Sequence, residues 1–277
     1  MENLSGRVCV VTGANGGIGK ATAAALARRG ATVAMVCRRP DAGTEARDEV
    51  ARDSGGDVHL LLADLASQTR VRHLAAEIGA RWGRVDVLVN NAGVYTRRRA
   101  TTADGIETQW AVNHLAPFLL THLLRDALAA GGGARVVTVS SEAHQGARLD
   151  WGDLQMERRY RPFRMYAWTK LANVLFTREL ARRLAGTGVT ANAMHPGVVA
   201  TELLMNGFPP IRLVRRFLRT PEQGARTAVW LAAAPEAAGL TGGYFRDERP
   251  ARPSAAALDD DDARRLWRWS EERTGIA

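Results

Sequence analysis

The stretch Thr12-Gly13-Ala14-Asn15-Gly16-Gly17-Ile18-Gly19 decides the fold that we expect for this chain of 277 residues. It follows an apolar, β-branched run over 8–11 and precedes a helical pattern over 18–29. Its glycines permit a tight turn and let backbone amides approach a bound pyrophosphate. The N-terminus of the following helix adds partial positive charge beneath the phosphates. A glycine-rich loop in this strand–loop–helix context predicts a dinucleotide site in the first βα unit.

Outward from this loop, short apolar runs alternate with Ala- and Leu-rich helical patterns. We expect strands at 8–11, 32–36, 58–62, 85–89, 135–139, 190–194 and near 243–245. We expect helices at about 18–29, 41–53, 68–82, 104–129, 166–185 and 221–234. Because the strands are nearly continuous apolar runs, both faces of a parallel sheet should be covered. The order predicts a doubly wound parallel α/β sheet of about seven strands, a Rossmann fold, in a single domain over 1–277.

Two stretches interrupt the alternation, at 146–165 and 198–220. The second is apolar around Pro209-Pro210, and we interpret it as a lid over an apolar substrate. A contact between copies of the chain or a membrane-surface helix is the alternative, because arginines alternate with apolar residues over 212–219. An acidic run at 259–262 opens a helix expected over 260–273, since acids in a first turn favour the helix dipole.

Composition excludes several classes of protein. Apolar residues make up 46% and charged residues 24%, which is typical of a folded domain, and 2 cysteines exclude a disulfide scaffold. No apolar run reaches the roughly 18 residues of a membrane span. The N-terminus enters a strand almost at once, so we expect neither signal peptide nor anchor, and a cytoplasmic location. Weak membrane-surface contact stays open.

The net charge of +9 is carried almost entirely by arginine, since only Lys20 and Lys170 of the 38 basic residues are lysines. Arginines are spread along the chain and accompany much alanine, which indicates a general composition bias. No nucleic-acid-binding motif accompanies the charge, so we expect no nucleic-acid partner. The two remaining lysines indicate places where an ammonium is required.

The end of the second strand predicts the cofactor. An acid there would bind the 2′-hydroxyl of NAD, but the strand ends in Val36-Cys37-Arg38-Arg39. Arg38 can hold a 2′-phosphate in a bidentate fork, and Lys20 could add a second positive charge. We therefore expect NADP (NADPH) rather than NAD. The missing acid also argues against a Rossmann-like methyltransferase.

Tyr166 and Lys170 predict the chemistry. Residues i and i+4 share one helix face, and an ammonium nearby stabilises phenolate and lowers the pKa of a tyrosine that is ordinarily about 10. The pair would form a general acid/base poised nearer neutrality. Other strand ends offer polar side chains at the same edge of the sheet. They are Asn90-Asn91-Ala92-Gly93, Ser140-Ser141 and His195-Pro196-Gly197, with Asn113 in the long helix between them.

In order and spacing these motifs resemble the short-chain dehydrogenase/reductase superfamily over essentially the full chain. The motifs are Thr-Gly-xxx-Gly-x-Gly, Asn-Asn-Ala-Gly, Ser, Tyr-xxx-Lys and Pro-Gly. Within it the chain resembles the retinol-dehydrogenase-like branch, through residues 13–20, 112–115, 139–144, 170–173 and 264–267.

The resemblance implies roles for individual residues. Tyr166 would be the proton donor and acceptor, Ser141 would bond the substrate oxygen with Ser140 as its rival, and Lys170 would also bind the nicotinamide ribose. Asn113 would hold a helix kink and a water in the proton relay. The expected cofactor-binding residues are Gly13, Asn15, Gly17, Ile18, Gly19, Arg38, Asp64, Asn91, Gly93, Tyr166, Lys170 and Thr201. We expect no metal, and structural rather than catalytic roles for His144 and His195.

The sequence therefore predicts an NADP-dependent oxidoreductase that moves a hydride between nicotinamide and a small apolar carbonyl or alcohol. The alternative is an NADP-binding sensor or interaction protein without turnover. Segments 94–102, 142–165 and 198–220 would select the substrate, whose identity the sequence leaves open. A homo-oligomer and a monomer are both open.

Overall fold

The computed structural model describes residues 2–200 and 218–276. Within them one eight-stranded sheet has the order β3-β2-β1-β4-β5-β6-β7-β8. The strands are β1 Val8–Thr12, β2 Thr32–Cys37, β3 Val58–Leu62, β4 Val87–Asn90, β5 Arg135–Val139, β6 Thr190–His195, β7 Tyr244–Arg246 and β8 Arg249–Pro250. All neighbours pair in parallel except β8, which runs antiparallel to β7. The doubly wound parallel fold predicted from the sequence is confirmed, with β8 as an extra strand.

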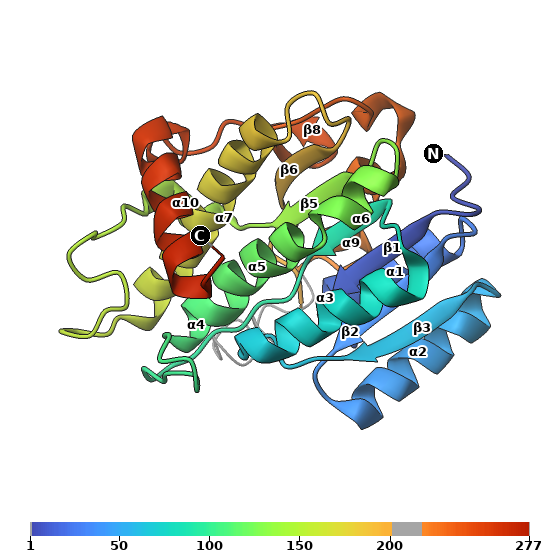
Figure 1. Cartoon of the computed structure of the whole chain (residues 1–277), viewed down its shortest axis with the longest axis horizontal. Coiled ribbons are helices and arrows are strands. Elements are labelled where there is room, and N and C mark those ends of the chain that lie inside the picture. Colours follow the sequence, from blue (N-terminus) through green and yellow to red (C-terminus); the bar gives the residue numbers. More distant parts are fainter. Residues whose placement is uncertain (1, 201–217, 277) are drawn as a thin grey trace.

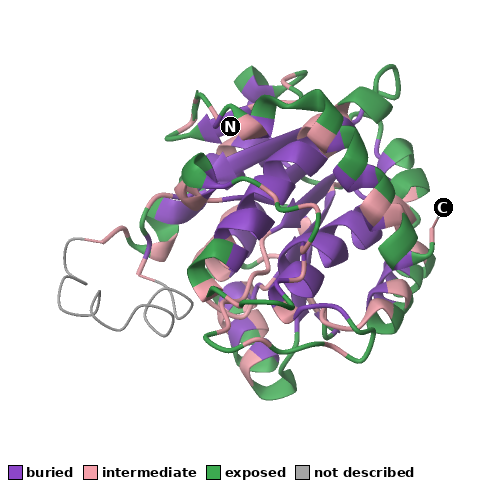
Figure 2. Cartoon of the chain, turned by 90° about the vertical axis from the view of Figure 1, so that its left-hand side faces the viewer, coloured by how far each residue is buried: buried purple, intermediate pink, exposed green. Residues whose placement is uncertain are grey.

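Helices cover both faces of this sheet (Figure 1). They are α1 Gly17–Ala27, α2 Pro40–Ser54, α3 Gln68–Trp82, α4 Thr108–Trp110, α5 Ala116–Leu123, α6 Arg125–Ala130, α7 Pro162–Arg183, α9 Pro221–Ala233 and α10 Asp260–Thr274. Successive strand residues point to opposite faces. In β1, Cys9 and Val11 therefore pack with α1, α2 and α9, whereas Val10 packs with α3 and α5. Figure 2 shows the resulting buried sheet between more exposed helices.

Two helices differ from the sequence prediction. The helix expected over 104–129 is divided into α4, a π-helical turn over Ala111–Leu115, α5 and α6. A π turn is a local widening that hydrophobic periodicity does not reveal. The helix expected from Tyr166 begins at Pro162, because proline suits the first helical position, where no N–H partner is needed. Tyr166 consequently lies one turn inside α7.

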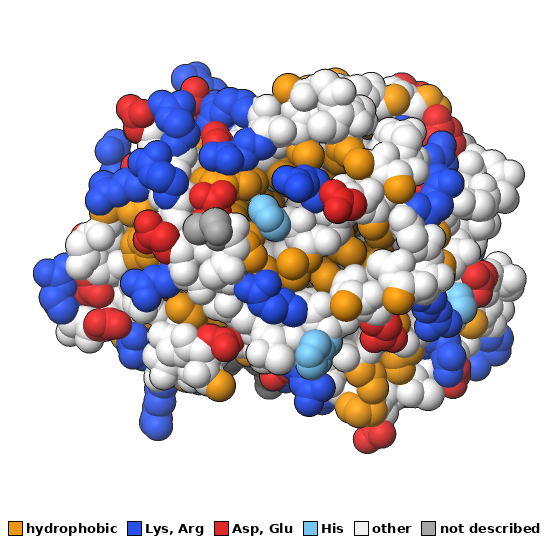
Figure 3. Space-filling view, in the orientation of Figure 1, with side chains coloured by type: hydrophobic (Ala, Val, Ile, Leu, Met, Phe, Trp, Pro, Cys, Tyr) orange, Lys and Arg blue, Asp and Glu red, His pale blue; other side chains and the backbone are white. Residues whose placement is uncertain are grey.

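Ion pairs join the helices at the surface. Arg178 and Arg182 of α7 bond Asp260 of α10 at 3.0 and 2.6 Å. On the face drawn in Figure 3, basic side chains lie interspersed with acidic ones. Among the helices described, none combines the length and apolar character that crossing a bilayer requires. The expected lid over 198–220 lies mostly outside the described residues.

Candidate active site

A cleft of about 1020 Å³ opens at the carboxyl ends of the central strands. Its walls come from the segments that follow β1 to β6, from α2 and from one face of α7. The strand order reverses beside β1 and β4, and open α/β sheets bind ligands at such a point. The predicted glycine loop, ribose-end residues and catalytic candidates all line this cleft, apart from Asn113 behind its wall and Thr201, which lies outside the described residues.

The glycine loop packs closely against the segment after β4 only because side chains are missing. Gly13 has a φ of +64°, and a Cβ there would lie 2.9 Å from Ala92 Cα. A Cβ on Gly19 would overlap the carbonyl oxygen of Gly13 and the amide of Asn91. The helix α1 begins at Gly17 and directs its free N–H groups at this space. These features fit a dinucleotide pyrophosphate.

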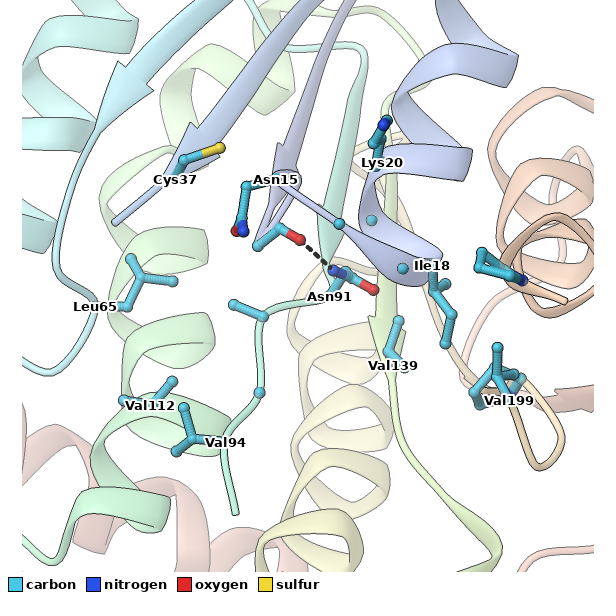
Figure 4. Close-up of a pocket in the computed structure, with 18 of the residues that line it drawn as sticks. Asn15, Ile18, Lys20, Cys37, Leu65, Asn91, Val94, Val112, Val139 and Val199 are labelled. Carbon is cyan, nitrogen blue, oxygen red and sulfur yellow. Dashed lines mark hydrogen bonds between the residues drawn. The ribbon is translucent and has the colours of Figure 1, made fainter. Parts of the chain in front are cut away.

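Thr12 and Asn91 hold this loop against the end of β4. Figure 4 shows Asn91 beside the loop, with a hydrogen bond to it as a dashed line. Asn91 Nδ2 donates to Thr12 O at 2.7 Å and to Gly13 O at 3.2 Å, while Thr12 Oγ1 accepts the N–H groups of Asn91 and Ala92, each at 3.0 Å. The Asn91 amide is thus occupied in shaping the loop. Sequence reasoning included Thr12 in the glycine motif but assigned it no role.

Gly19→Ala is expected to weaken NADPH binding at least about tenfold, because overpacking of this kind costs a few kcal/mol or displaces the loop. Gly79→Ala on α3 is the matched control, since a Cβ there meets nothing within 4 Å. Fluorescence titration with NADPH measures both. Equal NADPH affinity of Gly19→Ala and the wild type would contradict the inference that the loop has no room for a side chain at Gly19.

At the far end of the cleft, Arg38 and Arg39 follow β2 and are exposed. Among the described residues neither forms an ion pair, so both guanidinium groups are available to an anion. Lys20 instead pairs with Glu49 of α2. Asp64 lies exposed at the rim, where its carboxylate accepts the N–H of Ala66 at 3.0 Å.

Tyr166 and Lys170 lie on the same side of α7, with Lys170 Nζ 5.5 Å from the centre of the tyrosine ring. The buried ammonium donates to Val139 O at 3.1 Å. Burial lowers the pKa of Lys170 to about 8. Burial also raises the pKa of Tyr166 to about 12, opposed by a hydrogen bond with Ser141. The protein groups alone therefore do not produce the lowered phenol pKa expected from the spacing, because burial outweighs the hydrogen bond with Ser141.

The two serines after β5 have different partners. Ser140 is buried, and its hydroxyl donates to the carbonyl oxygen of Lys170 at 2.7 Å. Ser141 is half-buried, lines the cleft and bonds Tyr166. This arrangement favours Ser141 over Ser140 as the group that meets a substrate, with Ser140 supporting the helix behind it.

Asn113 lies fully buried in the π-helical turn. Its side chain accepts the N–H of Val94 at 2.7 Å, donates to Val94 O at 3.0 Å and donates to Thr169 Oγ1 at 3.1 Å. Thr169 in turn donates to Tyr166 O at 2.8 Å. In this structure Asn113 therefore joins the segment after β4 to the helix that carries Tyr166.

The two histidines near the cleft are held by backbone groups. His144 Nδ1 lies 2.6 Å from Ser141 O, and its Nε2 accepts the N–H of Ser254 at 3.2 Å. His195 Nδ1 accepts the N–H of Glu142 at 3.2 Å. Burial, more than the nearby arginines, lowers the pKa of His195 to about 4. Both rings are neutral near pH 7. No cluster of three metal-ligating side chains occurs within 2–200 and 218–276.

The fold and this cleft define an NAD(P)-dependent oxidoreductase. Residues 7–210 match the family model described as short chain dehydrogenase, and the chain belongs to that family. Its relatives place it in the retinol-dehydrogenase-like branch. It is 44% identical to human retinol dehydrogenase 12, over 99% of this chain and 88% of the relative. It is 43% identical to mouse polyprenol dehydrogenase, over 98% of this chain and 84% of the relative.

Solved structures agree with the fold. An uncharacterised protein from Mycobacterium paratuberculosis is 36% identical with a TM-score of 0.83, over 99% of this chain and 96% of the other. A protein from Beutenbergia cavernae, named as a candidate NAD(P)-dependent gluconate 5-dehydrogenase and solved with NADP at low occupancy, is 34% identical with a TM-score of 0.72. That match covers 88% of this chain and 95% of the other.

Proposed function

We propose that this protein reversibly transfers a hydride between NADP(H) and an apolar carbonyl or alcohol, with Tyr166 as the proton donor and acceptor. The observation that carries the proposal is that Tyr166, Lys170 and Ser141 converge on the cleft whose other end fits a dinucleotide. When bound there, the nicotinamide supplies or accepts the hydride. All other groups are contributed by the chain itself.

In the direction of reduction, the Ser141 and Tyr166 hydroxyls hold the substrate oxygen and stabilise the negative charge that develops on it. Tyr166 then gives its proton to that oxygen. Lys170 lies behind the phenol and stabilises the phenolate that remains, and it is kept in place through Val139 O and Ser140. Oxidation uses the same groups in reverse.

Apolar side chains of the cleft wall support an apolar class of substrate. Phe163 and Val198 line it and are 53% and 52% exposed, and Val94 lines it as well. An apolar substrate would cover such side chains. The relatives named for retinol and polyprenol support the same class of alcohol or carbonyl.

The proposal is tested by following NADPH and NADH oxidation with a panel of aldehydes and ketones, after fluorescence titration of each cofactor. Turnover of apolar carbonyls with NADPH is the expected result. Tight NADPH binding without oxidation across the panel would favour the sensor instead. The cytoplasmic location and the single domain stay predictions, and the oligomeric state stays open.

The preference for NADP rests on Arg38, which follows β2 and is exposed in the cleft. Arg38→Ala is expected to weaken NADPH binding about 10- to 100-fold, because a charge-assisted hydrogen bond contributes roughly 1.5–3 kcal/mol. NADH binding should change little. Arg47→Ala on α2 is the matched control, since its guanidinium forms an ion pair with Asp48 and does not line the cleft. A parallel loss for both cofactors would show that Arg38 does not read the 2′-phosphate.

A further inference from the structure

A hydrogen-bonded cluster that the proposed mechanism does not use lies beside the start of α7. The Tyr160 hydroxyl donates to Glu107 Oε1 at 3.0 Å, accepts from Gln109 Nε2 at 2.8 Å and lies 2.8 Å from Thr96 Oγ1. The hydroxyl also lies 3.3 Å from Thr96 O, a second acceptor for its proton. A phenol oxygen has one proton and two lone pairs, so these partners satisfy it. We call Thr96, Glu107, Gln109 and Tyr160 the Tyr160 cluster.

Glu107 makes the cluster rigid. The residue is fully buried, and its second carboxylate oxygen caps α4 by accepting the N–H of Trp110 at 2.9 Å. Its own N–H donates to Gln155 Oε1 at 2.8 Å. Burial raises the pKa of Glu107, while the hydrogen bonds from Trp110, Gln109 and Tyr160 oppose that rise. A buried carboxylate is costly unless it is bonded, so its partners are held in defined positions.

The cluster joins three separate parts of the chain. Thr96 belongs to the segment after β4, Glu107 and Gln109 to the start of α4, and Tyr160 to the irregular approach to α7. Gln109 Nε2 also donates to the carbonyl oxygen of Pro162, the first residue of α7, at 3.3 Å. The hydrogen bonds of Tyr160 thus fix the segment after β4 relative to the helix that carries the proposed proton donor.

Tyr95 lies between two residues that are held in this way. On one side Asn113 bonds both the N–H and the carbonyl oxygen of Val94. On the other side Thr96 belongs to the Tyr160 cluster. The Tyr95 ring stands edge-on to the Tyr166 ring, with 6.0 Å between centroids and an interplanar angle of 68°. It therefore packs against the ring whose hydroxyl would meet a substrate.

We propose that Tyr95 forms a specificity-determining wall of the substrate site, and that Tyr160 is the positioning residue that holds it against Tyr166. The inference rests on the proposed function, because it takes the Tyr166 hydroxyl as the place of reaction. A substrate with an aromatic group beside its carbonyl can pack on the Tyr95 ring, whereas a short aliphatic one cannot.

The test compares Tyr160→Phe with Tyr244→Phe. The first variant loses the hydrogen bonds of the Tyr160 hydroxyl to Thr96, Glu107 and Gln109. The control loses a buried hydroxyl that has no partner among the described residues. Hydrogen–deuterium exchange over 94–102 should become faster in Tyr160→Phe only. Thr96→Val removes one of the same bonds from the other side, and should reproduce the effect if Tyr160→Phe folds poorly.

The kinetic readout is the ratio of kcat/KM for benzaldehyde to that for propanal. It should fall about three- to tenfold in Tyr160→Phe, the range expected for one aromatic contact, with NADPH affinity unchanged. Tyr95→Ala should lower the ratio similarly, and the double variant should be no worse than Tyr95→Ala, because Tyr160 acts through Tyr95.

The outcomes separate this inference from the proposed function. Unchanged exchange over 94–102 in both Tyr160→Phe and Thr96→Val would overturn the positioning role, whether or not the protein turns over any carbonyl. Faster exchange with an unchanged substrate ratio would overturn the specificity role. If the wild-type protein fails to oxidise NADPH with every carbonyl tested, the proposed function is refuted, and the specificity role with it. Hydrogen–deuterium exchange would still decide the positioning role.

Discussion

Tyr166→Phe is expected to lower the turnover of NADPH with any carbonyl substrate by about 10²–10⁴-fold, the usual contribution of a positioned general acid. The change removes the hydroxyl that we propose as the proton donor to the substrate oxygen. It keeps the ring, so the edge contact with Tyr95 should persist. NADPH affinity should stay close to that of the wild type, because the glycine loop and Arg38 are untouched. Steady-state kinetics and fluorescence titration measure the two quantities.

Ser140→Ala provides an informative comparison for this variant. It removes a hydroxyl that already donates to Lys170 O, and it leaves the Ser141 and Tyr166 hydroxyls in place. We expect a smaller loss of turnover than in Ser141→Ala, which removes the hydroxyl bonded to Tyr166. A rate of Tyr166→Phe close to that of the wild type would contradict the proposed acid/base role, whatever the serine variants show.

The architecture could be predicted because it depends on local patterns. Strand 58–62 and helix 68–82 are found at the expected bounds, since apolar runs and 3.6-residue periodicity report which faces are buried. The extra strand β8 has only 2 residues, too few to show alternation. The π turn at Ala111–Leu115 was missed for a related reason, because one inserted residue barely alters hydrophobic periodicity.

The candidate site was only partly predictable. Strand ends place Ser140 and Ser141 near the cofactor, but adjacent serines face opposite sides, and the sequence alone does not say which faces the cleft. The Tyr160 cluster escaped prediction because Thr96, Glu107 and Tyr160 are distant in sequence and meet only through tertiary packing. Spacing likewise showed that Tyr166 and Lys170 are near one another, yet not how strongly burial affects both pKa values.

Burial of Lys170 predicts a pH dependence of the reductive rate. Burial disfavours the ammonium and lowers its pKa from 10.5 to about 8, so the side chain is charged below that pH and neutral above it. Tyr166, with a pKa of about 12, keeps its proton over the same range. The rate should therefore fall as pH rises above about 8, approaching tenfold per pH unit, because the phenolate left after proton transfer loses the positive charge beside it.

Measuring kcat for reduction between pH 6 and 10 at saturating NADPH tests this. Lys170→Met should lower the rate roughly 100-fold or more and abolish the fall above pH 8, because the titrating group is gone. Lys20→Met is the matched control, since Lys20 is the other lysine of the chain and pairs with Glu49, away from Tyr166. The reductive rate of Lys20→Met should still fall above pH 8. His195, with a pKa of about 4, stays neutral throughout and cannot produce it. If the rate of Lys170→Met still falls above pH 8, another group causes the fall, and the Lys170 ammonium has no place in the mechanism.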